Sequence, residues 1–89
     1  MNDAATNLGV IELKAGHLDK ALALWQGAFE RAPGRSTIGM NLVRGLCSGS
    51  QFEKARVAVT RVLEFNPDLQ VAQRLQKSLS ADPPSCTLQ

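Results

Sequence analysis

The feature that most constrains this chain is an internal repetition with a period of 34 residues. When the sequence is shifted against itself by this period, identical residues coincide at Asn7 and Asn41, Leu8 and Leu42, Lys20 and Lys54, Ala21 and Ala55, Glu30 and Glu64, and Pro33 and Pro67. Chance rarely gives so many matches in one register. The repetition therefore predicts two copies of one structural unit.

Within each unit the apolar residues recur with the period of an α-helix. The first unit has one stripe of Ala4, Leu8, Ile11 and Ala15, and a second stripe of Leu18, Ala21, Leu22, Trp25, Ala28, Phe29 and Ala32. Gly16 and Pro33-Gly34 end these helices, because glycine accepts a positive φ and proline cannot continue a helix. We expect the first stripe to pack on the second helix and Trp25 to lie in the core.

The second unit and the chain after it continue this pattern. A stripe of Phe52, Ala55, Val59, Val62 and Leu63 precedes Pro67, and a last, one-sided helix carries Leu69, Ala72, Leu75 and Leu79. We expect this last helix to cover Phe52, Val59, Val62 and Phe65. Gly39 and Gly45 fall inside a helix, where each costs about 1 kcal/mol relative to alanine. We interpret them as positions of close helix contact.

The sequence thus predicts an all-α fold, with two helix-turn-helix repeats plus a C-terminal capping helix and no strand. Helices are expected near residues 3–15, 18–32, 36–48, 52–65 and 69–80. The domain would cover residues 1–80, with repeat one at 2–35, repeat two at 36–69 and the capping helix at 69–80. Because Pro83-Pro84 prevents a helix, residues 81–89 are expected to form a disordered tail.

The positions at which the two units match resemble the pattern of the tetratricopeptide repeat family. The first unit matches at Leu8-Gly9, Gly16, Ala21, Trp25, Ala28 and Pro33, and the second at Leu42, Ala55, Val62 and Pro67. The resemblance covers about residues 2 to 80. The chain departs from the family at Ala5 and Gly39, which replace the first aromatic residue, and at Glu12, which replaces the usual tyrosine. These departures weaken the packing expected within each unit but leave the period intact.

The resemblance implies an α-α superhelix in which the first helix of each unit lines a concave groove. It places in this groove Thr6, Asn7, Val10, Leu13, Lys14, Met40, Asn41, Arg44, Cys47 and Ser48. Their spacing of three to four residues agrees with a single helix face. Chaperone-binding members hold a C-terminal carboxylate with a clamp of lysine, asparagine and arginine. Only Asn41 matches that clamp, so we do not expect it here.

Charge and composition argue against several other classes. The net charge is +2 and the ten basic residues are scattered, so no concentrated basic face predicts nucleic-acid binding. The sequence has neither a secretory signal nor an apolar run of membrane-spanning length, so no membrane association is expected. Cys47 and Cys86 form no metal-ligand motif. A single bridge between them is the less favoured alternative, because a cysteine buried in a helix and one in a tail are poor partners. We expect both to be free thiols, which favours a reducing, cytoplasmic compartment.

Residues that could carry chemistry are few. His17 lies in a turn with no carboxylate or cysteine paired to it by spacing, so we expect a solvated histidine. The C-terminal residues Cys86-Thr87-Leu88-Gln89 fit only the loose form of a prenylation signal, without a preceding basic stretch. No phosphate loop, carboxylate pair or nucleophile elbow is present. We expect no enzyme activity, no cofactor and no metal.

The leading expectation is a protein-protein interaction scaffold that binds a peptide or protein segment in the groove. The alternative is a structural role, as the C-terminal end of a longer repeat array that mediates assembly or self-association. Val10 and Leu13 lie off the main apolar stripe of the first helix, so that helix is apolar over most of its circumference. Preceding repeats of a parent protein, or a weak homo-oligomer, would then cover it.

Overall fold

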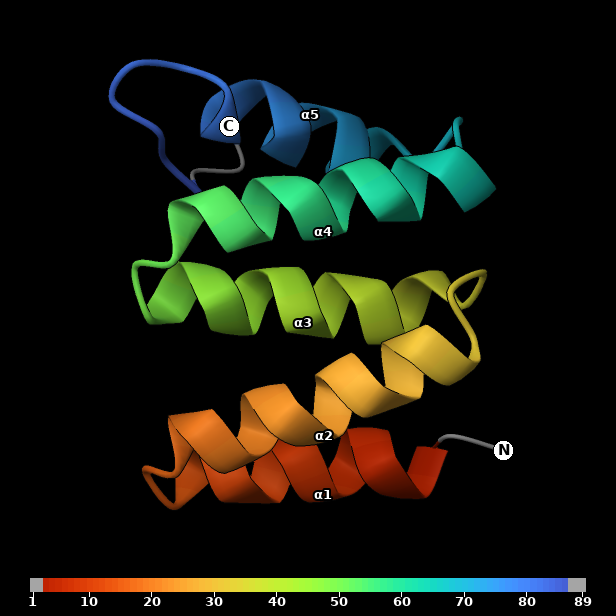
Figure 1. Cartoon of the computed structure of the whole chain (residues 1–89), viewed down its shortest axis with the longest axis vertical. Helices are drawn as coiled ribbons and strands as arrows, with labels where there is room; N and C mark the ends of the chain where they lie inside the picture. The colour runs from red at the N-terminus through yellow and green to blue at the C-terminus, as the bar shows by residue number, and fades with distance from the viewer. Residues whose placement is uncertain (1–2, 87–89) are drawn as a thin grey trace.

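The computed structural model describes the backbone of residues 3–86, and at the N-terminal end it describes side chains from Asn7 onward. The described chain contains five helices and no strand: α1 (Asp3–Lys14), α2 (Leu18–Arg31), α3 (Ser36–Ser48), α4 (Phe52–Phe65) and α5 (Gln70–Leu79). The helices follow one another along the long axis, from α1 at one end to α5 at the other (Figure 1). The all-α prediction is confirmed, and each observed end lies within one residue of the expected one.

The turns after α1 and α3 have the same hydrogen bonds, 34 residues apart. In the first turn the N–H of Gly16 bonds the carbonyl of Leu13 at 3.0 Å, and the N–H of His17 bonds Glu12 at 2.8 Å. In the second turn Ser50 bonds Cys47 at 3.0 Å, and Gln51 bonds Leu46 at 2.8 Å. This paired pattern closes a helix with a residue in the left-handed region. Gly16 has φ +86°, as expected, whereas Ser50 adopts φ +58° without the freedom of a glycine.

Trp25 on α2 joins the first three helices. Its indole is 2% exposed. A Cβ at Gly9 of α1 would lie 2.6 Å from its Cε2 atom, and a Cβ at Gly45 of α3 would lie 2.7 Å from its Cζ3 atom. The ring therefore fills the space that two glycines leave between three helices. This confirms both the core position of Trp25 and close helix contact at Gly45.

The rest of the core continues from α2 through α3 and α4 to α5. Gly39 contacts Val62, and a Cβ there would lie 3.0 Å from Cε1 of Phe29, so close contact is confirmed at this glycine as well. On α5 the side chains of Ala72, Leu75 and Leu79 are buried. The helix packs on α4, where Val59 and Val62 are fully buried. Phe65 differs from the expectation, because its ring stays 48% exposed with the Arg61 guanidinium 5.6 Å from its centroid.

The orientation of α1 was predicted wrongly. Leu8 and Ile11 were expected to pack on α2, yet they are 46% and 60% exposed, and Ala15 is exposed as well. The side chain of Ala4 lies outside the described residues. Gly9 is buried instead, because the large indole of Trp25 can approach α1 only where the helix carries no side chain. The contact with Trp25, rather than the longest apolar stripe, sets the rotation of this helix.

Candidate functional site

The expected groove residues of α3 lie on one side of that helix, between its contacts with α2 and α4. Arg44 and Ser48 are exposed, Asn41 and Cys47 are half-buried, and Met40 is almost completely buried. The other sides of α3 are occupied by the core, where Ile38, Leu42, Val43 and Leu46 are buried. The structure therefore brings the α3 part of the predicted site together on one surface.

Two adjoining hollows lie along this surface between α3 and α5. The larger, about 330 Å³, is lined by Arg44, Cys47, Ser48, Leu75 and Cys86. The smaller, about 230 Å³, is lined by Ser36, Thr37, Met40, Asn41, Arg44, Leu69 and Val71. Arg44 belongs to both linings and so stands where the two meet. We call this pair the α3–α5 hollow.

The α3–α5 hollow combines an apolar wall with polar groups on its α3 side. Leu69, Val71 and Leu75 supply apolar surface from the start and middle of α5. Arg44 is exposed and forms no ion pair within residues 3–86, and its backbone carbonyl accepts the Ser48 hydroxyl at 3.1 Å. A guanidinium in this position can bind a carboxylate through two parallel hydrogen bonds.

A disulfide bond closes one end of this surface. Cys47 on α3 is bonded to Cys86, 39 residues later, with their Cα atoms 6.1 Å apart. The expectation of two free thiols is wrong, because packing of the chain after α5 brings Cys86 back beside α3. The Ser85 N–H also bonds the carbonyl of Ser78 at 3.0 Å. Residues 81–86 therefore follow a defined path where a disordered tail was expected, while residues 87–89 lie outside the described part.

The expected groove residues of α1 do not line the α3–α5 hollow. Asn7, Leu13 and Lys14 are exposed, and Val10 is half-buried against the core. The side chain of Thr6 lies outside the described residues. The groove of α1 and α3 followed from the analogy with the repeat family. The α5 wall and Cys86 were not predicted, although Leu69 and Leu75 were expected as apolar positions of the last helix.

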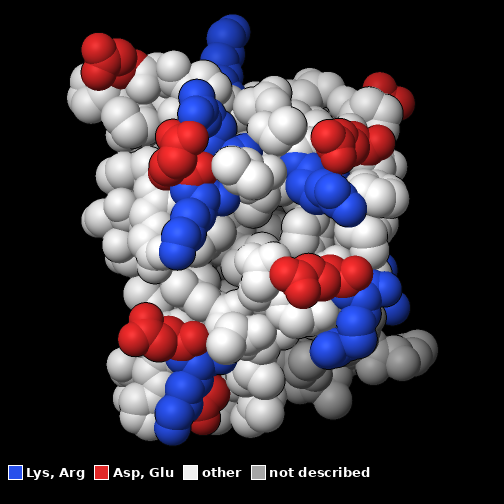
Figure 2. Space-filling view, viewed as in Figure 1, with Lys and Arg blue, Asp and Glu red and all other residues white. Residues whose placement is uncertain are grey.

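A third hollow, of about 430 Å³, lies between α2 and α4 and was not predicted. Phe29, Pro33, Leu42, Val57 and Ala58 give it an apolar lining, and Gln26, Glu30, Glu53, Lys54 and Arg61 complete it. Its acidic groups already have neighbours, since Glu30 accepts from Gln26 at 3.0 Å and Glu53 pairs with Arg56 at 2.6 Å. Basic and acidic side chains are interspersed over the face drawn in Figure 2, which shows no large patch of one sign.

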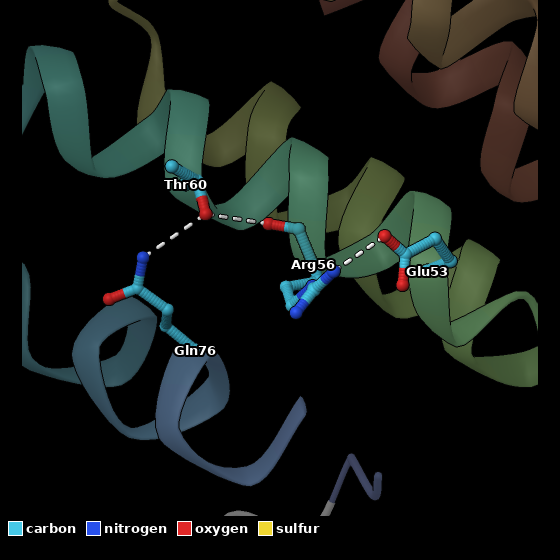
Figure 3. A network of polar contacts seen from close by, with 4 residues as sticks. All are labelled: Glu53, Arg56, Thr60 and Gln76. Carbon is cyan, nitrogen blue, oxygen red and sulfur yellow. Dashed lines mark hydrogen bonds and ion pairs between the residues drawn. The ribbon is translucent and has the colours of Figure 1, made fainter. Parts of the chain in front are cut away.

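A chain of polar contacts links the outer surfaces of α4 and α5 (Figure 3). The Gln76 amide donates to the Thr60 hydroxyl at 3.1 Å, and that hydroxyl donates to the carbonyl of Arg56 at 2.8 Å. The Arg56 guanidinium pairs in turn with Glu53. Because these groups are exposed, the network contributes little to stability, and the packing of α5 on α4 rests on its buried side chains Ala72, Leu75 and Leu79.

One further polar pair lies at the turn after α1. His17 contacts Glu12 through its Nδ1 atom at 3.0 Å, a pairing that sequence spacing did not suggest; its side chain is about half exposed. Within residues 3–86, no three histidine, cysteine, aspartate or glutamate side chains lie close enough together to hold a metal ion. None of the described helices has the length and apolar character needed to cross a membrane.

Comparison of the chain with protein-family models, with curated proteins and with solved structures found no match.

Proposed function

We propose that this protein is an interaction scaffold, not an enzyme, and that it binds a peptide or protein segment in the α3–α5 hollow. The observation that carries the proposal is the position of Arg44, an exposed cation without an ion pair in the described chain, at the meeting point of two part-apolar hollows. Peptide recognition commonly combines apolar anchors with one charged orienting contact.

The size of the two hollows favours side chains over a whole small molecule. Pockets for small ligands typically measure about 300–1,000 Å³. Taken one at a time, the volumes of about 230 and 330 Å³ lie below and near the lower end of that range, and Arg44 stands between the two hollows. A segment with one apolar side chain in each hollow and a carboxylate between them would place that carboxylate at Arg44. We therefore propose an acidic ligand with apolar anchors.

The proposed scaffold is a short tetratricopeptide-like array of two units with α5 as its cap, whose helices would continue as an α-α superhelix. Three observations support this arrangement. Residues coincide at a period of 34, the helices begin and end at corresponding places, and the turns after α1 and α3 share their hydrogen bonds at the same spacing. Under this proposal the disulfide at Cys47 is a specific feature of this chain, closing one end of the binding surface.

The proposal is tested by titrating the ¹⁵N-labelled protein with two short peptides. One carries an aspartate between a leucine and a valine, and in the other an asparagine replaces the aspartate. We expect the acidic peptide to bind more tightly and to shift amide signals of α3 and α5. Arg44→Ala should weaken its binding about two- to fivefold, the range of an exposed ion pair.

Arg31→Ala is the matched control, because it removes the same charge from an exposed position on α2. It should leave the affinity unchanged. Equal binding of both peptides, or equal effects of the two arginine variants, would contradict the role of Arg44. Signal changes confined to α2 and α4 would show that the peptide binds in the hollow between those helices instead.

A further inference from the structure

The apolar surface of α1 that faces away from the core has counterparts, one and two periods later, at the α2–α3 and α4–α5 contacts. We define the α1 stripe as Leu8, Ile11 and Ala15, all of which are exposed. Shifted by 34 residues, these positions become Leu42, Gly45 and Gly49 on the α3 side. Leu42 is only 1% exposed, against 46% for Leu8. The same leucine position is thus buried in one unit and exposed in the other.

The counterpart positions are those at which α3 meets the helix before it. A Cβ at Gly45 would lie 2.7 Å from Trp25 and 2.8 Å from Leu22, and one at Gly49 would lie 3.0 Å from Cδ2 of Leu18. These three partners all belong to α2. A contact with the preceding helix is found again one period later, on α5. There Gln76, which is in register with Leu42, donates a hydrogen bond to the hydroxyl of Thr60 on α4.

We infer that the α1 stripe is a docking surface for one amphipathic helix of a partner protein segment, seated on α1 as α2 is seated on α3. The contact would continue a series in which α3 packs on α2 and α5 packs on α4. The inference does not depend on the α3–α5 hollow, which uses other residues.

The side chains of the stripe specify the size of the partner residue. Gly45 of α3 faces the large Trp25 of α2. At the contact between α4 and α5 the register places the larger residue on the later helix. Leu79 is in register with Gly45, and Val59 is in register with Trp25. Ile11 occupies this same position on α1, so a tryptophan opposite it would be overpacked. The partner helix therefore resembles α4, with a valine-sized residue at the central position, and not α2.

A second copy of this chain offers its own α1 stripe, but that stripe carries Leu8 and Ile11, which are larger than the valine-sized residue that the register calls for. The apolar side of α2 is covered by α3 within the same molecule, and that of α4 is covered by α5. The remaining outer surface of α5 consists of exposed polar residues, among them Gln73, Arg74 and Lys77. The occupant is accordingly a helix of another protein segment.

The preference of α1 for a valine-sized partner residue is tested by adding a known helix before α1, in the 34-residue register of the chain. One chain carries an extra copy of residues 36–69 before residue 2, with serine in place of the cysteine of that copy, so that an α4 helix precedes α1. The other chain carries an extra copy of residues 2–35 before residue 2, so that an α2 helix precedes α1. Amide exchange of α1 should become about tenfold slower or more in the first chain, as burial of Leu8 and Ile11 suppresses local opening. It should change little in the second.

Ile11→Gly serves as the reciprocal variant, because it recreates at α1 the space that Gly45 provides. It should restore protection by the α2 copy and weaken protection by the α4 copy. Exchange of α3 and α5 in the same samples controls for folding of the chain. Equal protection by both copies, no protection by either, or an unaltered preference in the Ile11→Gly variants would overturn the inference. So would a natural chain that dimerises in sedimentation and becomes monomeric on Ile11→Lys.

Discussion

The clamping of Trp25 between Gly9 and Gly45 gives the sharpest prediction for stability. Gly9→Ala adds a methyl group to α1 that would lie 2.6 Å from Cε2 and 2.9 Å from Cδ1 of an indole that is itself buried. The ring cannot move without disturbing α2 and α3. Gly27→Ala adds the same group inside α2, where the nearest described side-chain atom is a guanidinium nitrogen of Arg31 at 3.5 Å, an ordinary contact. The two variants therefore differ in packing but share one change in helix propensity.

The magnitudes follow from these two terms. Replacing a helical glycine by alanine favours the helix by about 0.8–1 kcal/mol. Overpacking of a filled core costs about 1–3 kcal/mol. Gly27→Ala should therefore raise the free energy of unfolding by about 1 kcal/mol, whereas Gly9→Ala should leave it unchanged or lower it by up to about 2 kcal/mol. For a domain of this length, 1 kcal/mol corresponds to about 4–8 °C in Tm.

Thermal and urea unfolding, followed by circular dichroism and by fluorescence of Trp25, measure both variants. A double-mutant cycle with Trp25→Leu isolates the contact, since alanine at position 9 should no longer be penalised once the ring is removed. We expect a coupling free energy of about 1–3 kcal/mol. If Gly9→Ala stabilises the natural chain as much as Gly27→Ala does, the close approach of Trp25 to α1 is wrong.

Three further changes test other parts of the structure. Truncation after Pro67 removes α5 and uncovers the apolar side of α4, so we expect the cooperative thermal transition to disappear; a truncated chain with an unaltered Tm would exclude α5 from the core. Reduction of the Cys47–Cys86 disulfide, or Cys86→Ser, should lower the free energy of unfolding in urea by about 2–4 kcal/mol, because the bond closes a long loop, and the two treatments should agree. Ser50→Gly relieves a left-handed serine and should raise Tm by an amount equivalent to about 0.5–1 kcal/mol, whereas Gly16→Ser at the matching turn should lower it.

The candidate site was predicted only in part. The helical period correctly predicted one shared face for Met40, Asn41, Arg44, Cys47 and Ser48, because residues three and four apart lie on the same side of a helix. The other wall of the hollow comes from α5, whose approach to α3 depends on packing across α4. The prediction of α1 as the second wall followed from the analogy, and no local pattern could have corrected it.

The sequence by itself determined the helices and their ends. Apolar residues at a spacing of three to four, Gly16 in a left-handed turn and Pro33 after α2 act within a few residues of chain, so their effect can be read locally. The tertiary structure decided the rotation of α1, the path of residues 81–86 and the pairing of Cys47 with Cys86. The rotation of α1 depended on which residue could admit the Trp25 ring, and the disulfide depended on bringing together two residues 39 positions apart. Such contacts are set by the competition of whole surfaces for burial, which no single stretch of sequence contains.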